Sequence, residues 1–247
     1  MGQRRTLNQK RLTKKEVQEI IKTEGHLHHE YTKFFEETYV TGYVKQDKVY
    51  ELPGDRFLYV FDETGLHGKG DIYSKDYFLK WKKRIERIRE DYKNNRGSSV
   101  SHWFYYSKYK SDILDHQEQL LIELSDRLKI DQNKLDRSYK SLDLISAECS
   151  QLDFEFIFRN LYDNLVTYVG EVIKLRVDGI WAINKTHVGG EYPYISIGFE
   201  QVQYMPINAI WSSFDGIDPI DFRKQAADEV RLNGSKAYFY RNWSHKL

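Results

Sequence analysis

Three histidines supply the first pattern in this sequence that could do chemistry. His26, His28 and His29 are close enough together to suggest a metal site, and His26 and His29 would share one face if the segment were helical. Zinc sites normally add cysteines or a longer His–Glu pattern, and neither accompanies these histidines. We interpret the cluster as solvated histidines, and the sequence predicts neither a metal nor a cofactor.

Two further polar groups could serve catalysis. The segment His67–Asp71 is rich in glycine but lacks the spacing of a phosphate-binding loop. His187 and Glu191 flank a Gly189–Gly190 turn and could face each other across a hairpin, although no third catalytic partner is visible. For Glu171, on a largely apolar helix, a structural role is the simpler interpretation. The sequence predicts no catalytic residue, and an enzyme with an unrecognised site stays an alternative.

The composition narrows the classes of protein that this chain can belong to. Lys and Arg number 38 and Asp and Glu number 37, so no global charge indicates nucleic acid or membrane. Cys149 is the only cysteine, which indicates a reducing compartment, and its apolar neighbours predict a buried thiol. No apolar run approaches the roughly 20 residues that span a bilayer, and no apolar signal segment follows the basic start. We expect a cytoplasmic protein without a membrane partner.

The hydrophobic and turn patterns along the chain predict the elements that position these residues. Together they indicate an α+β fold of helices with small antiparallel sheets in two subdomains. Residues 1–97 are expected to hold short helices, two strands over 48–52 and 56–61, and a long helix that is apolar on one face and basic over 80–96 on the other. The polar segment 94–99 is the best linker candidate, which sets a boundary after Gly97.

Residues 98–247 are expected to form the second α+β domain. It contains three helices, a small antiparallel sheet, and a closing helix that stops at Asn233–Gly234. Residues around Trp211 are expected to form a loop. The three helices are expected over 113–128, 135–149 and 154–173, and the strands over 180–183, 192–199 and 201–205.

An acidic excess on the first two helices of the second domain is the second charged surface of the sequence, beside the basic helix. It is either a solvated face or a docking surface for a basic protein, since charge complementarity accelerates encounter and sets specificity. The aromatic run that precedes these helices is expected to add exposed rings to the same surface. The residues predicted to bind a partner are Asp112, Asp115, Glu118, Glu123, Asp126, Trp103, Tyr105 and Tyr106.

Two places in the sequence resemble known bacterial families. Arg56–Glu63 followed by Gly68–Tyr73 resembles segments of small immunity proteins from polymorphic-toxin systems. Tyr168–Val172, followed by Trp181 and the strand at Pro193, resembles small α+β domains of unknown function that occur in the same gene neighbourhoods. The resemblance implies an immunity protein, which neutralises a toxin by binding over its active site and has no catalytic residues of its own.

The leading hypothesis is therefore a non-enzymatic protein-binding protein, most concretely a bacterial immunity protein whose partner is a basic toxin domain. The alternative from another class is a nucleic-acid-associated protein that uses the basic helix 80–96. This alternative is disfavoured because the aromatic residues of that helix, Trp81 and Tyr92, fall on its apolar face and not among the basic side chains.

Overall fold

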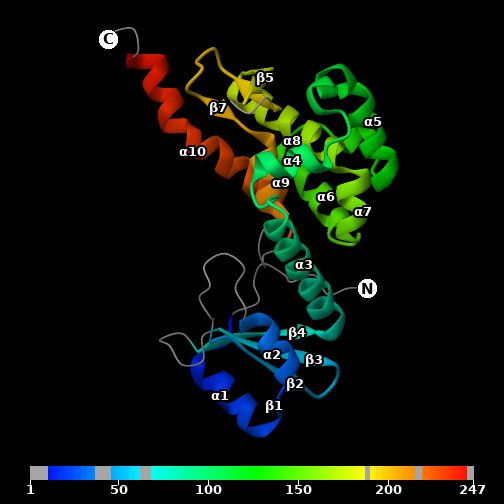
Figure 1. Cartoon of the computed structure of the whole chain (residues 1–247), viewed down its shortest axis with the longest axis vertical. Coiled ribbons are helices and arrows are strands. Elements are labelled where there is room, and N and C mark those ends of the chain that lie inside the picture. The colour runs from blue at the N-terminus through cyan, green and yellow to red at the C-terminus, as the bar shows by residue number, and fades with distance from the viewer. Residues whose placement is uncertain (1–10, 37–45, 62–67, 187–189, 215–218, 244–247) are drawn as a thin grey trace. The chain divides into compact units, whose positions relative to one another are not determined.

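The computed structural model of the chain describes residues 11–36, 46–61, 68–186, 190–214 and 219–243. It shows an α+β protein, as expected, in which the described strands form one four-stranded and one three-stranded antiparallel sheet among helices (Figure 1). The chain divides into two compact units, Met1–Tyr92 and Lys93–Leu247. The sequence places this division after Gly97.

The first unit is built on the four-stranded sheet, whose strands follow one another in chain order. Strands β2 and β3 have the predicted bounds, and the Pro53–Asp55 turn joins them. Strand β4 was not expected because Gly70 and Asp71 resemble a loop. Strand β4 needs a glycine at position 70, because a Cβ there would clash with the Tyr59 carbonyl oxygen of β3 at 2.7 Å. The elements are α1 (Lys14–Thr23), β1 (His26–Leu27), α2 (His29–Glu36), β2 (Lys48–Leu52), β3 (Arg56–Phe61), β4 (Lys69–Ser74) and α3 (Lys75–Lys93).

Each face of this sheet has its own apolar cluster, because successive strand residues point to opposite sides. One face packs aromatic side chains such as Phe57 and Tyr59 against α2 and α3, with Trp81 stacked on Phe35 at 4.6 Å. The other face packs aliphatic side chains against Val17 of α1. Both faces are therefore occupied within the unit.

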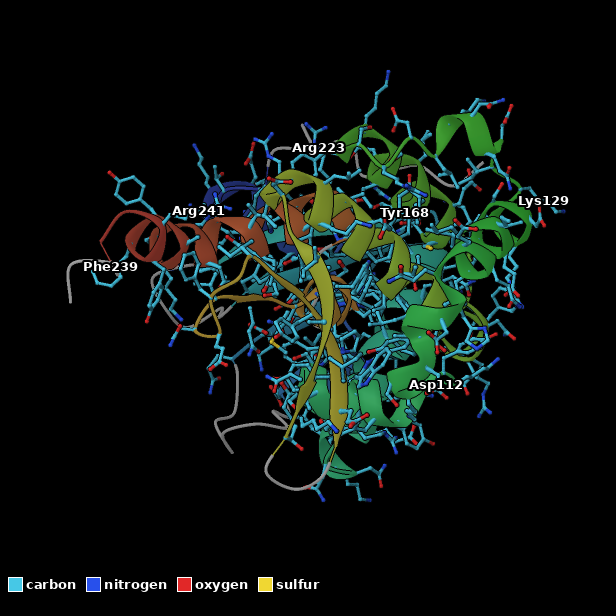
Figure 2. The ribbon with its side chains drawn as sticks, turned by 90° about the horizontal axis from the view of Figure 1, so that it is seen from above. Asp112, Lys129, Tyr168, Arg223, Phe239 and Arg241 are labelled. Carbon is cyan, nitrogen blue, oxygen red and sulfur yellow. The ribbon has the colours of Figure 1, made fainter. Side chains whose placement is uncertain are left out.

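The second unit is organised around one buried helix, α8. Every residue from Leu161 to Ile173 is buried, which is the pattern of a helix enclosed on all sides. The Arg241 guanidinium, labelled in Figure 2, donates to the Val177 carbonyl oxygen at 3.0 Å and so satisfies the C-terminal end of α8. The surrounding elements are α4 (Ser99–Tyr106), η1 (Lys110–His116), α5 (Gln117–Leu128), η2 (Gln132–Lys134), α6 (Tyr139–Cys149), α7 (Phe154–Asn160), α8 (Tyr162–Val177), β5 (Ile180–Lys185), β6 (Glu191–Ser196), β7 (Gln203–Tyr204), α9 (Pro206–Phe214) and α10 (Phe222–Trp243).

Three sequence predictions for this unit were wrong. The helix expected over 154–173 is two helices, interrupted at Leu161. The segment around Trp211 is helix α9 and not a loop. The closing helix continues through Asn233–Gly234, because Val230 and Ala237 on either side of it pack in the core of this unit and override the local stop signal. Among the described residues, no helix is both long and apolar enough to cross a membrane.

Candidate protein-binding surface and pocket

The aromatic run predicted to face a partner is only partly exposed. It forms helix α4, which a Ser98–Ser101 capping box starts, and the helical turn separates its rings. Tyr105 is 57% exposed, with the Arg96 guanidinium 4.0 Å from its ring centre. Trp103 is fully buried and donates from Nε1 to the Glu191 carbonyl oxygen at 3.0 Å. Tyr106 is also buried. The expectation that Trp103 and Tyr106 are exposed is therefore wrong, since residues three apart on this helix both face the core.

The acidic residues form a stripe along η1 and α5, which we call the acidic stripe. It consists of Asp115, Glu118, Ile122 and Asp126, spaced three or four residues apart, so that they share one face. The three carboxylates are exposed and form no ion pair with any other residue that the structure describes. Ile122 lies between Glu118 and Asp126 and is 51% exposed. Asp112 is exposed on the preceding turn.

Glu123 lies on the flank of α5 and has a different environment from the stripe. Its Oε1 accepts from Gln119 Nε2 at 2.9 Å, and its Oε2 accepts from Arg127 Nη2 at 3.4 Å. The Gln119 hydrogen bond is the main cause that lowers the pKa of Glu123, and Arg127 adds to it. Glu123 is therefore engaged within the chain, and it is not part of the acidic stripe.

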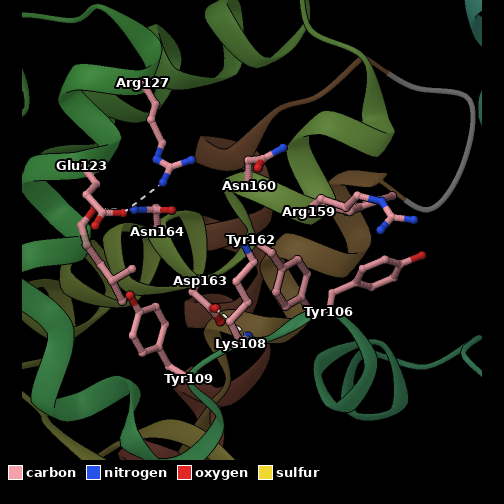
Figure 3. Close-up of a pocket in the computed structure, with 12 residues that line it drawn as sticks. Tyr106, Lys108, Tyr109, Glu123, Arg127, Arg159, Asn160, Tyr162, Asp163 and Asn164 are labelled. Atoms are coloured by element: carbon pink, nitrogen blue, oxygen red, sulfur yellow. Dashed lines mark hydrogen bonds and ion pairs between the residues drawn. The ribbon is translucent and has the colours of Figure 1, made fainter.

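A pocket lies between the end of α4, the flank of α5 and the junction of α7 with α8 (Figure 3). Two of the predicted partner-binding residues, Tyr106 and Glu123, line this pocket. Tyr109, Phe158 and Tyr162 add aromatic walls, so the lining combines rings with charged groups. The volume of the cavity itself is about 50 Å³, far below that of a pocket for a whole small-molecule ligand.

Asp163, in the first turn of α8, is the buried charged group of this pocket. It is 5% exposed, and its Oδ2 accepts from the Lys108 backbone N–H at 2.8 Å. Oδ1 is buried without a hydrogen-bond partner in the part of the chain that the structure describes. Burial raises the pKa of Asp163, although the Ser107 hydroxyl, the Lys108 and Tyr109 N–H groups and the Lys110 charge act to lower it. None of these groups donates a hydrogen bond to Oδ1 in the described part of the chain.

Most cations around the pocket are already engaged. Arg127 pairs with Glu123, and Arg159 pairs with Glu155 on α7. Lys110 directs Nζ to the Phe104 carbonyl oxygen, and burial lowers its pKa. Lys108 is exposed and forms no ion pair with any described residue. It is therefore the one lining cation without a compensating charge among the described residues.

Among the described residues, the side chains that the sequence singles out for catalysis do not assemble into a site. Glu171 is buried and accepts from Trp181 Nε1 at 2.7 Å and Lys174 Nζ at 2.6 Å, which is a structural role. Cys149 is buried, and burial raises its pKa to about 12. Glu191 pairs with Lys185 at 3.1 Å. His67 and His187 lie outside the described residues.

The histidine cluster shows no sign of a metal site. His26 is in strand β1 and His29 begins helix α2, so the two do not share a helix face. The His28 ring stacks on Tyr31 at 3.9 Å. Over the described ranges, no group of three or more His, Cys, Asp or Glu side chains is placed to hold a metal ion.

The basic face of α3 is largely committed to contacts within the first unit. Lys82 pairs with Glu86 at 2.6 Å, and its Nζ lies 4.5 Å from the Phe34 ring centre. The Arg89 guanidinium lies 4.1 Å from the same ring centre and donates to the Phe34 carbonyl oxygen. Arg84 is buried. These side chains are not a free row of cations for a phosphate backbone.

Sequence reasoning did not single out the two residues that define the surface and the pocket. Ile122 was detectable as an apolar residue four positions from an acidic one on either side. Asp163 was detectable as a carboxylate on a mostly apolar helix. Neither signal states which neighbours would surround the side chain.

Comparison of the chain with protein-family models, curated proteins and solved structures finds no match.

Proposed function

We propose that this chain is a non-enzymatic protein-binding protein that recognises a basic partner through the acidic stripe. The observation that carries the proposal is Ile122, half exposed between Glu118 and Asp126. An apolar anchor surrounded by charged residues is typical of protein interfaces, where the anchor supplies affinity and the charges steer encounter. Because the stripe carboxylates have no ion-pair partner among the described residues, they are available to a cationic surface.

Most concretely, we propose a cytoplasmic bacterial immunity protein that covers the active site of a basic toxin domain. The resemblance at Arg56–Tyr73 motivates this narrower proposal. A toxin domain is basic if it acts on nucleic acid, because its surface must then neutralise phosphates. The acidic stripe is complementary to such a surface.

The test is the association of this chain with the purified product of the neighbouring reading frame, followed by stopped-flow fluorescence at low and high salt. Glu118→Lys should slow association about three- to tenfold at low salt and less at high salt, because steering is screened. Ile122→Ala should leave the association rate unchanged and accelerate dissociation by about tenfold, because it removes apolar contact.

The matched control is Glu148→Lys, which makes the same charge reversal at an exposed position on α6. This variant should associate like the parent. If the triple reversal of Asp115, Glu118 and Asp126 associates as fast as the parent, the stripe is not the interface. Retention of the chain on heparin that is lost on reversing the exposed Lys80 and Lys83 would instead support the nucleic-acid alternative.

A further inference from the structure

The pocket beside the acidic stripe has a feature that folding alone does not explain. Asp163 Oδ1 is buried and has no hydrogen-bond partner in the described part of the chain. Leaving a buried acceptor unpaired costs stability, more so for a carboxylate than for a neutral group. Such a group is well suited to a ligand that brings its own hydrogen-bond donor.

We propose that the pocket is a binding site for a guanidinium group, the side chain of an arginine from the partner. A cationic N–H donor is the group that gains most at Asp163 Oδ1, because charge-assisted hydrogen bonds to a carboxylate are about twice as strong as neutral ones. That the arginine belongs to a protein partner rests on the proposed function. That the pocket binds a guanidinium group does not depend on the proposed function.

The lining favours a guanidinium over an ammonium. The rings of Tyr109 and Tyr162 lie on either side of Asp163, and the Tyr106 ring lies beyond Tyr162 in the lining (Figure 3). A planar guanidinium can stack on an aromatic ring and still direct N–H groups in its own plane to a carboxylate, whereas an ammonium is a compact point charge. The small volume fits the head of one side chain and not a whole cofactor.

The cations of the lining do not block such a ligand. Arg127 is paired with Glu123 and Arg159 with Glu155, so each carries its own counter-charge. Lys108 is the exception, since it has no ion-pair partner among the described residues. It is exposed and opposes a second cation only through a solvent-screened repulsion. Removal of the Lys108 charge should therefore strengthen binding, and removal of the Asp163 charge should weaken it.

The experiment is an NMR titration of the full chain, with N-acetyl-arginine amide as the probe and N-acetyl-citrulline amide as its neutral match. The reporter is the Lys108 amide resonance, because this N–H donates to Asp163. The arginine probe should produce a saturable shift at constant ionic strength, and the citrulline probe should not. Asp163→Asn should weaken arginine binding by about tenfold or more. Lys108→Gln should tighten it by roughly threefold.

Asp115→Asn, which removes an exposed charge of the stripe, should bind the probe like the parent. The proposal is overturned by equal responses to both probes, by no saturable shift, or by unchanged affinity in Asp163→Asn. Should Asp163→Asn fail to fold, the surface variant Lys108→Gln decides: without tighter binding the proposal falls. Because the probe needs no partner, this result is separate from that of Glu118→Lys, and either proposal can fail alone.

Discussion

The indole of Trp181 covers Gly170 so closely that a Cβ on the glycine would lie 2.1 Å from the indole Cη2. Its Nε1 donates to Glu171, the next residue of α8, at 2.7 Å. Strand β5 is thus held against α8 by one side chain that uses both its ring and its N–H group. Gly170 is present because no larger residue leaves room for the indole.

Replacement of Gly170 by alanine should lower the free energy of unfolding by about 1–3 kcal/mol, because overpacking outweighs the gain in helix propensity. The measurement is urea unfolding followed by tryptophan fluorescence. Gly234→Ala is the matched control: it also lies within a helix, and its Cβ would meet nothing within 4 Å. It should raise stability by about 0.5–1 kcal/mol. Equal effects of the two changes would contradict the close contact of Trp181 with Gly170.

Thr32 on α2 bonds to strand β2 at Val49, just beyond the two residues of β2 that pair with β1. Its Oγ1 accepts from the Val49 N–H at 3.0 Å, and both residues are buried. Thr32→Val keeps the shape of the side chain but leaves that N–H unpaired, which should cost about 1–3 kcal/mol in urea unfolding. Thr23→Val changes an exposed threonine whose hydroxyl donates to the Glu19 carbonyl oxygen of its own helix, and it should cost much less. A similar loss in both variants would show that the Thr32 hydrogen bond is not responsible.

The thiol of Cys149 should be unreactive in the folded protein. It is buried, and desolvation raises its pKa to about 12, so little thiolate exists at neutral pH. Mixing with a chromogenic disulfide reagent at about pH 8 should label the thiol only as fast as the chain unfolds, and stoichiometrically in denaturant. Rapid labelling without denaturant would exclude the buried position.

Asp163 should make stability depend on pH in the direction opposite to most carboxylates. Its folded pKa is raised, chiefly by burial, so above about pH 4 the unfolded chain loses this proton first. The free energy of unfolding that Asp163 contributes therefore falls as pH rises toward the raised pKa. Asp163→Asn removes this effect, so the variant should gain stability relative to the parent as pH rises in urea unfolding.

Asp136 provides the control of opposite sign. The Ser138 side-chain and backbone hydrogen bonds are the main causes that lower its pKa, so its contribution is present above the ordinary pKa and is lost as pH falls through the folded pKa. Asp136→Asn should therefore lose stability relative to the parent as pH rises through the acid range. The same pH trend in both variants would contradict the different environments of the two carboxylates.

Local chemistry determined much of the fold from the sequence. The Thr13–Glu16 capping box begins α1, and the Pro53–Asp55 turn joins β2 and β3 at their predicted bounds. Such signals depend on residues that are near each other in the chain, which is why they can be read without a structure. The acidic side chains of α5 were also identifiable, because helical spacing alone places Glu118 and Asp126 on one face.

Only the tertiary structure decided which of these residues can meet a partner. The sequence alone could not show that Trp103 and Tyr106 turn inward while Tyr105 turns outward, because the direction depends on which face of α4 the core covers. The same holds for α10, which continues past Gly234 although its local signals predict a stop. The Asp163 carboxylate is buried because α4, α5 and α7 enclose the first turn of α8, and segments distant in the chain create that desolvation.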